Sequence, residues 1–255
     1  MTWFAHQAPV LPLKLARPTW FDATALCIGS MMPDLMYSFS SYADIDTHEW
    51  TPALVWGLPI TVVVSAIVRV VVAPVAAHQV PDLGPFRLHS YAVLAHRRPL
   101  LLITIASAAV GIVSHIVLDA FTHEGRWGVR WLGYDDILVE VGSFRHTLAS
   151  VLQYIGHVLG SAIAVLLLWA IGRRHLLDQW YGADAVEQAR AHSYDRAQRI
   201  TFWTLAAGGA VGGLLWGASD YVDLIQRVAV GAFVGAVAGS LVITSRHRRR
   251  RTTDR

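Results

Sequence analysis

Three polar side chains at helical spacing lie at the end of a long apolar stretch. His115, Asp119 and His123 are spaced i, i+4 and i+8. Each step of four residues drifts by only about 40° around a helix, so all three side chains share one face. Imidazole and carboxylate groups one turn apart can bind a divalent cation, and the middle aspartate can bridge two. The alternative is structural hydrogen bonding at the wet end of a membrane helix, but an aspartate there is costly, which favours metal binding or catalysis.

Three further candidate ligands precede the first long apolar stretch: His6, Asp34 and His48. Each also has a structural interpretation. His6 can be a polar interfacial residue, Asp34 can form a turn that stops a helix, and His48 can lie at the membrane surface. The basic C-terminal tail predicts a cytoplasmic C-terminus, and counting back through five predicted spans places residues 1–52 and the loop 122–150 on the outer side. His6, Asp34 and His48 are thus expected on the same side as His115, Asp119 and His123, which supports a shared site.

The composition predicts a polytopic membrane protein. Of 255 residues, 54% are hydrophobic and only 15% are charged, whereas a soluble domain carries about 25% charged residues. The single cysteine excludes a disulfide framework and a zinc ribbon. The sequence contains no Walker A, GxSxG, GxGxxG or HExxH motif. Several common classes of soluble enzyme are thereby excluded.

Five apolar runs are long enough to cross a hydrocarbon core of about 30 Å as helices. They are residues 53–72, 99–121, 151–171, 201–218 and 228–244. The weaker segment 21–39 contains Pro33-Asp34, which should end a helix, so we expect it to pack on the bundle or lie in the interface. The predicted fold class is an all-α polytopic membrane helical bundle, with about five transmembrane helices plus an N-terminal packed or interfacial helix.

Charge predicts the orientation and the division of the chain. The C-terminal tail contains five arginines within residues 246–251, which predicts a cytoplasmic C-terminus in a bacterial inner membrane and argues against a nucleic-acid site. Glycines recur every four residues in the last two spans, as in closely packed helices. The predicted parts are a metal-site membrane domain (1–171), a cytoplasmic loop (172–200), a Gly-rich transmembrane hairpin (201–245) and a basic cytoplasmic tail (246–255).

The sequence resembles a bacterial membrane family, domain-of-unknown-function family 4184. The resemblance covers roughly the first 160 residues. It rests on Phe4-Ala5-His6, Ile28-Gly29-Ser30-Met31-Met32-Pro33-Asp34, Thr47-His48-Glu49-Trp50 and Ser114-His115-x-x-x-Asp119-x-Phe121-Thr122-His123-x-Gly125. That family in turn resembles YdjM-type membrane-bound metal-dependent hydrolases and, more distantly, the helical zinc-dependent phospholipase C and nuclease fold.

The resemblance implies a divalent metal site, with zinc as the expected metal. The implied ligands are His6, Asp34, His48, His115, Asp119 and His123. The soluble enzymes continue with an HxxxE motif on a later helix. The nearest counterpart here runs from Gln153 to His157 and has no carboxylate, so one or two ions are expected instead of three.

Two functions follow as alternatives. The first is a membrane-bound metal-dependent hydrolase acting on phosphodiester or lipid-linked substrates, with Asp119 as a catalytic ligand and Glu124 or Glu49 as the nearest spare carboxylate for general base catalysis. The second is a non-catalytic scaffold or partner subunit with a buried polar network. A small transporter is disfavoured because the spans show no inverted repeat. Membrane lipid is the expected partner.

Three arginines on the candidate side of the membrane, Arg126, Arg130 and Arg145, have two interpretations. Guanidinium groups bind phosphate and lipid head groups through paired hydrogen bonds. They also anchor loops at the membrane interface. The sequence alone leaves both open.

Overall fold

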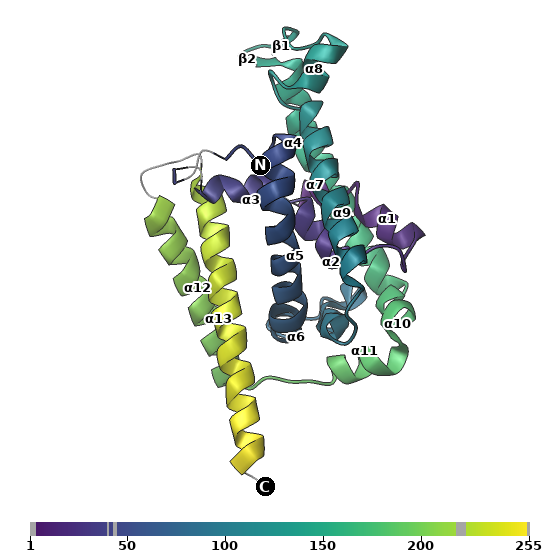
Figure 1. Cartoon of the computed structure of the whole chain (residues 1–255), viewed down its shortest axis with the longest axis vertical. Helices are drawn as coiled ribbons and strands as arrows, with labels where there is room; N and C mark the ends of the chain where they lie inside the picture. The colour runs from purple at the N-terminus through teal and green to yellow at the C-terminus, as the bar shows by residue number, and fades with distance from the viewer. Residues whose placement is uncertain (1–3, 40, 43–44, 218–222, 254–255) are drawn as a thin grey trace. The chain divides into compact units, whose positions relative to one another are not determined.

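The computed structural model describes residues 4–39, 41–42, 45–217 and 223–253. Helices make up 74% of the chain (Figure 1). Within the described ranges, the sheet structure is one antiparallel pair, β1 (Leu138–Val141) and β2 (Phe144–Thr147), in which Glu140 pairs with Arg145. The expected all-α polytopic bundle is therefore confirmed.

Five helices are long and apolar enough to cross a membrane. They are Trp50–Ala76, Leu101–Ala120, Leu148–Arg173, Arg196–Gly217 and Leu224–Ser245. Each predicted apolar run corresponds to one of these helices, and the chain is an integral membrane protein. Ala218, predicted as the end of the fourth span, and the last two residues of the basic tail lie outside the described residues.

The first spanning helix is built from several segments. It contains α4 (Trp50–Pro52), α5 (Leu58–Ile67) and α6 (Ala73–Ala76), joined by π-helical segments at Ala53–Gly57 and Val68–Val72. The other four spans lie in α7 (Leu101–Ala120), α9 (Leu148–Arg173), α12 (Arg196–Gly217) and α13 (Leu224–Thr253). The remaining α-helices are α1 (Leu11–Ala16), α2 (Ala23–Gly29), α3 (Met32–Met36), α8 (Trp127–Leu132), α10 (Leu176–Tyr181) and α11 (Ala183–Arg190), and the 3-10 helices are Ala5–Gln7, Tyr37–Phe39, Gly84–Phe86 and Leu88–Ala95.

The chain forms two compact units. Unit 1 contains Met1–Asp34, Ile45–Val62 and Leu100–Leu167, and unit 2 contains Leu35–Asp44, Val63–Pro99 and Leu168–Arg255. All six metal ligands implied by the resemblance belong to unit 1. The four-part division drawn from composition follows the chain and stays a prediction.

In unit 1, two glycines allow α2 to approach α7 closely. A Cβ added to Gly111 would lie 2.5 Å from the carbonyl oxygen of Leu26, and one added to Gly29 would lie 2.5 Å from that of Ala108. Asp22 begins α2, since its carboxylate accepts hydrogen bonds from the backbone N–H groups of the first turn. The same carboxylate accepts a hydrogen bond from Thr104 of α7 at 2.9 Å. The bond to Thr104 and the close approach at the two glycines hold α2 against α7.

Segment 21–39 forms short helices in place of a spanning one. The helix does end before Pro33, at Gly29, but α3 begins at Met32 and has Pro33 and Asp34 in its first turn. Proline is accepted there because the N–H groups of the first turn have no partner within the helix. The predicted helix end before Pro33-Asp34 is therefore present, and Pro33 also lies at the start of the next helix, which the sequence reasoning did not foresee.

Unit 2 is built around the antiparallel pair α12 and α13, which lie side by side in Figure 1. Gly209 and Gly213 of α12 meet the backbone of α13 at Gly231 and Arg227, so a Cβ at either position would clash with a carbonyl oxygen. The predicted glycine-mediated packing is present. A core of Val75, Phe202 and Ile243 lies within the same unit.

Candidate metal centre

Four buried side chains of unit 1 converge on one point. They are Asp34, His48, His115 and Asp119. Each offers one ligand atom, and these four atoms all lie within 4.8 Å of one another. All four residues are at most 7% exposed. This group could hold a metal ion, although two of its members are far from the other two in the sequence.

Each side chain is positioned by its local structure. His115 and Asp119 lie one turn apart on α7, as their spacing predicts, and Asp34 lies in the first turn of α3. His48 lies in the turn before α4, where its backbone N–H donates to the Asp46 carboxylate at 2.9 Å. The hydroxyl of Thr47 donates to the carbonyl of Pro33 at 2.8 Å. This bond ties the His48 turn to the helix that carries Asp34.

The distances match a small coordination shell. The Nε2 atoms of His115 and His48 lie 3.3 and 3.4 Å from Oδ2 of Asp119, and 3.7 and 3.5 Å from Oδ1 of Asp34. The two Nε2 atoms are 3.2 Å apart. Ligands about 2.0–2.1 Å from a tetrahedral zinc ion lie about 3.3 Å from one another. Two nitrogens and two oxygens at this spacing fit a divalent cation of borderline hardness.

A backbone contact orients His115 for this role. Its Nδ1 lies 2.8 Å from the carbonyl oxygen of Ser30. A carbonyl can only accept, so Nδ1 carries the proton and Nε2 presents its lone pair to the other three ligands. Metal-bound histidines usually donate their second N–H to a carbonyl or carboxylate in this way. The contact of α2 with α7 is therefore also what orients His115.

Hydrogen bonds decide the pKa values of the two cluster residues that lie outside the spans, His48 and Asp34. Burial acts to lower the pKa of His48, but hydrogen bonds to the carboxylates of Asp119 and Asp34 outweigh it and raise that pKa to about 9. Burial acts to raise the pKa of Asp34, but the hydrogen bond to His48 outweighs it and lowers that pKa. Without a cation, a proton on His48 thus links the two carboxylates, and a bound metal ion would replace this proton.

His6 reaches the cluster but stays outside the group of four. Its ring stacks on His115 with centroids 4.0 Å apart, and its Nε2 lies 3.6 Å from Oδ1 of Asp119. Burial, and then the neighbouring His115, lower the pKa of His6 to about 3, so its ring is neutral. Among the described residues, neither Nδ1 of His6 nor Oδ1 of Asp119 has a hydrogen-bond partner. Oδ1 of Asp119 is thus a buried acceptor that lies closer to His6 and His123 than to a hydrogen-bond donor.

His123 lies beyond the end of α7 and is partly exposed. Its backbone N–H still donates to the carbonyl of Asp119 at 3.0 Å, which keeps it one turn further on. Its Nδ1 lies 3.6 Å from Oδ1 of Asp119 and 3.2 Å from the hydroxyl of Thr122, and its Nε2 lies 2.6 Å from the amide of Gln153. The Thr122 hydroxyl donates to Leu118, so Nδ1 of His123 donates to Thr122. In this arrangement both ring nitrogens of His123 are engaged by Thr122 and Gln153, and its Nδ1 offers no lone pair to an ion beside Asp119.

The two candidate general bases have different surroundings. Glu124 is exposed and accepts hydrogen bonds from two hydroxyl groups, that of Thr147 at the end of β2 and that of Ser150 in the first turn of α9, the second at 2.7 Å. These bonds lower the pKa of Glu124. Glu49 lines a pocket beside the cluster and lies 3.8 Å from a guanidinium nitrogen of Arg126. Of the two, Glu49 is the one that faces the cluster's pocket.

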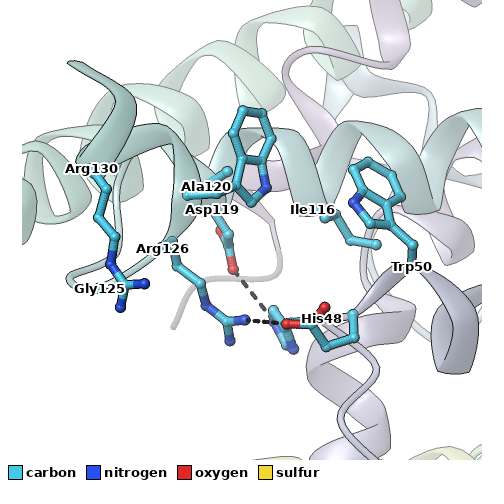
Figure 2. Close-up of a pocket in the computed structure, with 10 residues that line it drawn as sticks. His48, Trp50, Ile116, Asp119, Ala120, Gly125, Arg126 and Arg130 are labelled. Atoms are coloured by element: carbon cyan, nitrogen blue, oxygen red, sulfur yellow. Dashed lines mark ion pairs between the residues drawn. The ribbon is translucent and has the colours of Figure 1, made fainter.

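A pocket of about 410 Å³ opens beside the four ligands. His48 and Asp119 form part of its wall, together with Trp50, Trp127 and the two arginines Arg126 and Arg130. Figure 2 shows Asp119 and His48 facing each other, with the guanidinium group of Arg126 next to them. The volume lies in the range of small-molecule binding sites. Arg145, by contrast, pairs with Glu140 in the β-hairpin at 2.8 Å.

Sequence reasoning missed two parts of the site. The carbonyl of Ser30 orients His115, and the only sequence signal for this contact is the pair of glycines, Gly29 and Gly111, that allow the close approach of the helices. The second part is the pair of tryptophans in the pocket wall, Trp50 and Trp127. Both lie near the ends of apolar stretches, where tryptophan commonly anchors a protein at the membrane interface, so the sequence does not distinguish a pocket residue from an anchor.

Comparison with known proteins places the chain in a family. No curated protein and no solved structure matches it. A family whose description is "Domain of unknown function (DUF4184)" matches residues 2–245, nearly the whole chain and more than the resemblance drawn from the motifs. This match includes every residue of the buried cluster and of the pocket beside it. The chain therefore belongs to the family Domain of unknown function (DUF4184).

Proposed function

We propose that this protein is a membrane-bound metal-dependent hydrolase acting on a phosphodiester or lipid-linked substrate. The observation that carries the proposal is the convergence of Asp34, His48, His115 and Asp119 on one buried point beside an open pocket. Buried carboxylates and imidazoles in a membrane protein are costly and indicate function. We further propose a bacterial cytoplasmic membrane, with the C-terminus in the cytoplasm and the site at the outer face.

The residues fit a divalent cation, with zinc as the proposed metal. The donor set is two imidazole nitrogens and two carboxylate oxygens at mutual distances that suit a tetrahedral ion. Oδ1 of Asp119 is a buried acceptor without a donor in the described part of the chain. It faces His6 and His123, each 3.6 Å away. One ion would be held by the group of four. A second could share Asp119 with His6, and His123 would join it only after Nδ1 of His123 gives up the proton that it donates to Thr122.

The chain's own groups divide the work of such a reaction. A bound divalent cation would supply Lewis acidity, polarising a phosphoryl or acyl oxygen and lowering the pKa of water toward about 7. Asp34, His48, His115 and Asp119 would hold that cation, and the carbonyl of Ser30 keeps Nε2 of His115 unprotonated and available to it. Glu49, on the pocket wall, is the carboxylate placed to accept a proton from a nucleophile in the pocket.

Metal analysis of the full chain, purified in detergent, tests this proposal. Wild-type protein should retain zinc after dialysis, while the Asp119→Ala and His115→Ala variants should lose it. Asp184→Ala, an exposed aspartate of α11, is the matched control and should retain zinc. Hydrolysis of a panel of phospholipids by the same samples should follow the zinc content. Unchanged metal content in both site variants would refute the proposal.

One observation favours a non-catalytic alternative. A protonated His48 lies between the two aspartates and satisfies much of the cluster without a metal ion. A scaffold or partner subunit could use this buried network for stability alone. Under this alternative, EDTA treatment should leave the thermal unfolding temperature unchanged, and no lipid of the panel should be hydrolysed. Under the hydrolase proposal, EDTA should lower that temperature, because a bound ion stabilises only the folded state.

A further inference from the structure

Two arginines on one face of α8 line the pocket beside the cluster. Arg126 precedes the first residue of α8, and Arg130 lies four residues further on, so both side chains extend to the same side of the helix. Figure 2 shows both guanidinium groups on the pocket side, together with Asp119 and His48. The pocket therefore places two positive charges beside the candidate metal position.

Within the described ranges, each guanidinium group has only long ion-pair contacts with carboxylates. Arg126 lies 3.8 Å from Glu49 and 3.9 Å from Asp46, and Arg130 lies 3.8 Å from Asp135. A charge-assisted hydrogen bond would measure about 2.7–2.9 Å, so these contacts are loose ion pairs. Within the part of the chain that the structure describes, neither guanidinium group makes a hydrogen bond. Their N–H donors are available to a ligand in the pocket.

We infer that Arg126 and Arg130 bind the phosphate group of the substrate, which makes the substrate class a phosphate ester. This inference rests on the proposed function. A phosphate monoester has three non-bridging oxygens for two guanidinium groups and a neighbouring cation. A phosphodiester has two, which point to different corners of a tetrahedron and can each meet a different guanidinium group, whereas the two oxygens of a carboxylate lie in one plane and suit a single guanidinium group. The loose partners Glu49 and Asp46 hold Arg126 in place until the phosphate replaces them.

The other side of the pocket suits the remainder of a lipid-like ester. Trp50 and Trp127 line it, and both are more than 40% exposed. Tryptophan is enriched where a membrane protein meets the head-group region. The phosphate can thus belong to a lipid head group or to a water-soluble ester, and the experiment has to separate these two sources.

Calorimetric titration of the full chain in detergent tests the inference. The probes are inorganic phosphate, dihexanoylphosphatidic acid, acetate as a carboxylate and dihexanoylglycerol as an uncharged lipid. Both phosphate probes should bind, and acetate and dihexanoylglycerol should bind much more weakly. Arg126→Gln and Arg130→Gln should each weaken phosphate binding about tenfold or more, the usual effect of losing a hydrogen bond to a charged group.

Arg145→Gln is the matched control, because Arg145 belongs to the same loop between α7 and α9 but pairs with Glu140 in the hairpin. It should bind phosphate as the wild type does. Binding of the lipid phosphate alone, weakened by the two variants, supports the inference and assigns the phosphate to a lipid head group. Binding of both probes supports it and shows that the phosphate suffices.

Three results would overturn the inference: wild-type phosphate binding by both arginine variants, equal binding of acetate or dihexanoylglycerol, and no binding of any phosphate probe. A second set of titrations on protein stripped with EDTA and dialysed separates this inference from the proposed function. Arginine-dependent phosphate binding should persist there at reduced affinity. Should wild-type protein contain no zinc, the hydrolase proposal fails while the arginine comparison still gives its result.

Discussion

Replacing Gly111 by alanine should disturb the candidate metal site without touching any of its ligands. Gly111 lies on α7, one turn before His115, and faces α2. The added Cβ would lie 2.5 Å from the carbonyl oxygen of Leu26 and 2.8 Å from the backbone nitrogen of Ser30. Both are backbone atoms, so no flexible side chain can move aside. The two helices must separate.

The separation can be worked out from these contacts. Moving the Leu26 oxygen from 2.5 Å to the ordinary contact distance of 3.4 Å requires about 0.9 Å. The same displacement of Ser30 would stretch its hydrogen bond to His115 from 2.8 Å to about 3.7 Å, beyond hydrogen-bonding range. Loss of such an orienting bond typically lowers metal affinity about 10- to 100-fold. Overpacking at the helix contact should also cost about 1–3 kcal/mol of stability.

Zinc affinity and thermal unfolding of Gly111→Ala in detergent measure the two effects. Affinity is read by competition with a chromophoric chelator. Gly156→Ala on α9 is the matched control, because its added Cβ meets no atom within 4 Å in the described part of the chain. The control should keep wild-type zinc affinity and gain up to about 1 kcal/mol from helix propensity. Wild-type affinity and stability in Gly111→Ala would refute the argument that the contact of α2 with α7 orients His115.

Three further predictions concern unit 2. Gly213→Ala should lower the thermal unfolding temperature, because its added Cβ would clash with the carbonyl of Arg227. Gly212→Ala is the control and should not lower it, because an added Cβ there meets open space. Equal unfolding temperatures of the two variants would contradict the glycine packing of α12 and α13. Arg227→Ala should lower the free energy of unfolding by about 3–5 kcal/mol, because it removes the ionic partner of the buried Asp223 carboxylate. Denaturant unfolding measures this loss, and a loss below about 1 kcal/mol would contradict the role given to this buried ion pair. Burial acts to raise the pKa of Asp82, but hydrogen bonds from a backbone N–H and from an arginine of α11 outweigh burial and lower that pKa below 3.8. The ionised Asp82 therefore contributes stability above pH 3.8, and this contribution is lost as the pH falls through the lowered pKa. Asp82→Asn should therefore unfold with a flatter dependence on acid pH than the wild type, and parallel curves would count against this.

The overall fold could be predicted from local properties of the sequence. A membrane span needs only a run of about 20 apolar residues, so the five spans are visible in composition alone. The alignment of His115 with Asp119 was equally local, because it follows from the periodicity of a single helix. The glycine repeats predicted the close packing of α12 with α13, since small residues at this spacing allow helix backbones to approach.

The prediction of His123 as an equal partner depended on extending the helical pattern past the last residue of α7. The helix ends at Ala120, and the side chain of His123 is instead engaged by Thr122 and Gln153. Glu124, chosen because it is near in sequence, accepts hydrogen bonds from Thr147 at the end of β2 and Ser150 at the start of α9. Side chains that follow a helix end take their direction from whichever neighbours the loop brings, and periodicity no longer applies to them.

Tertiary structure alone decided which polar residues share one centre. Asp34 and His48 join His115 and Asp119 because α2 packs closely on α7 and because Thr47 bonds to the carbonyl of Pro33. These are contacts between backbone and side-chain atoms far apart in the chain, and their geometry depends on the whole packing of unit 1. The sequence by itself determined a membrane bundle and the residue types able to bind a cation, because both follow from local composition and helix period. The selection of four ligands, and the pocket with two arginines beside them, arose from long-range packing.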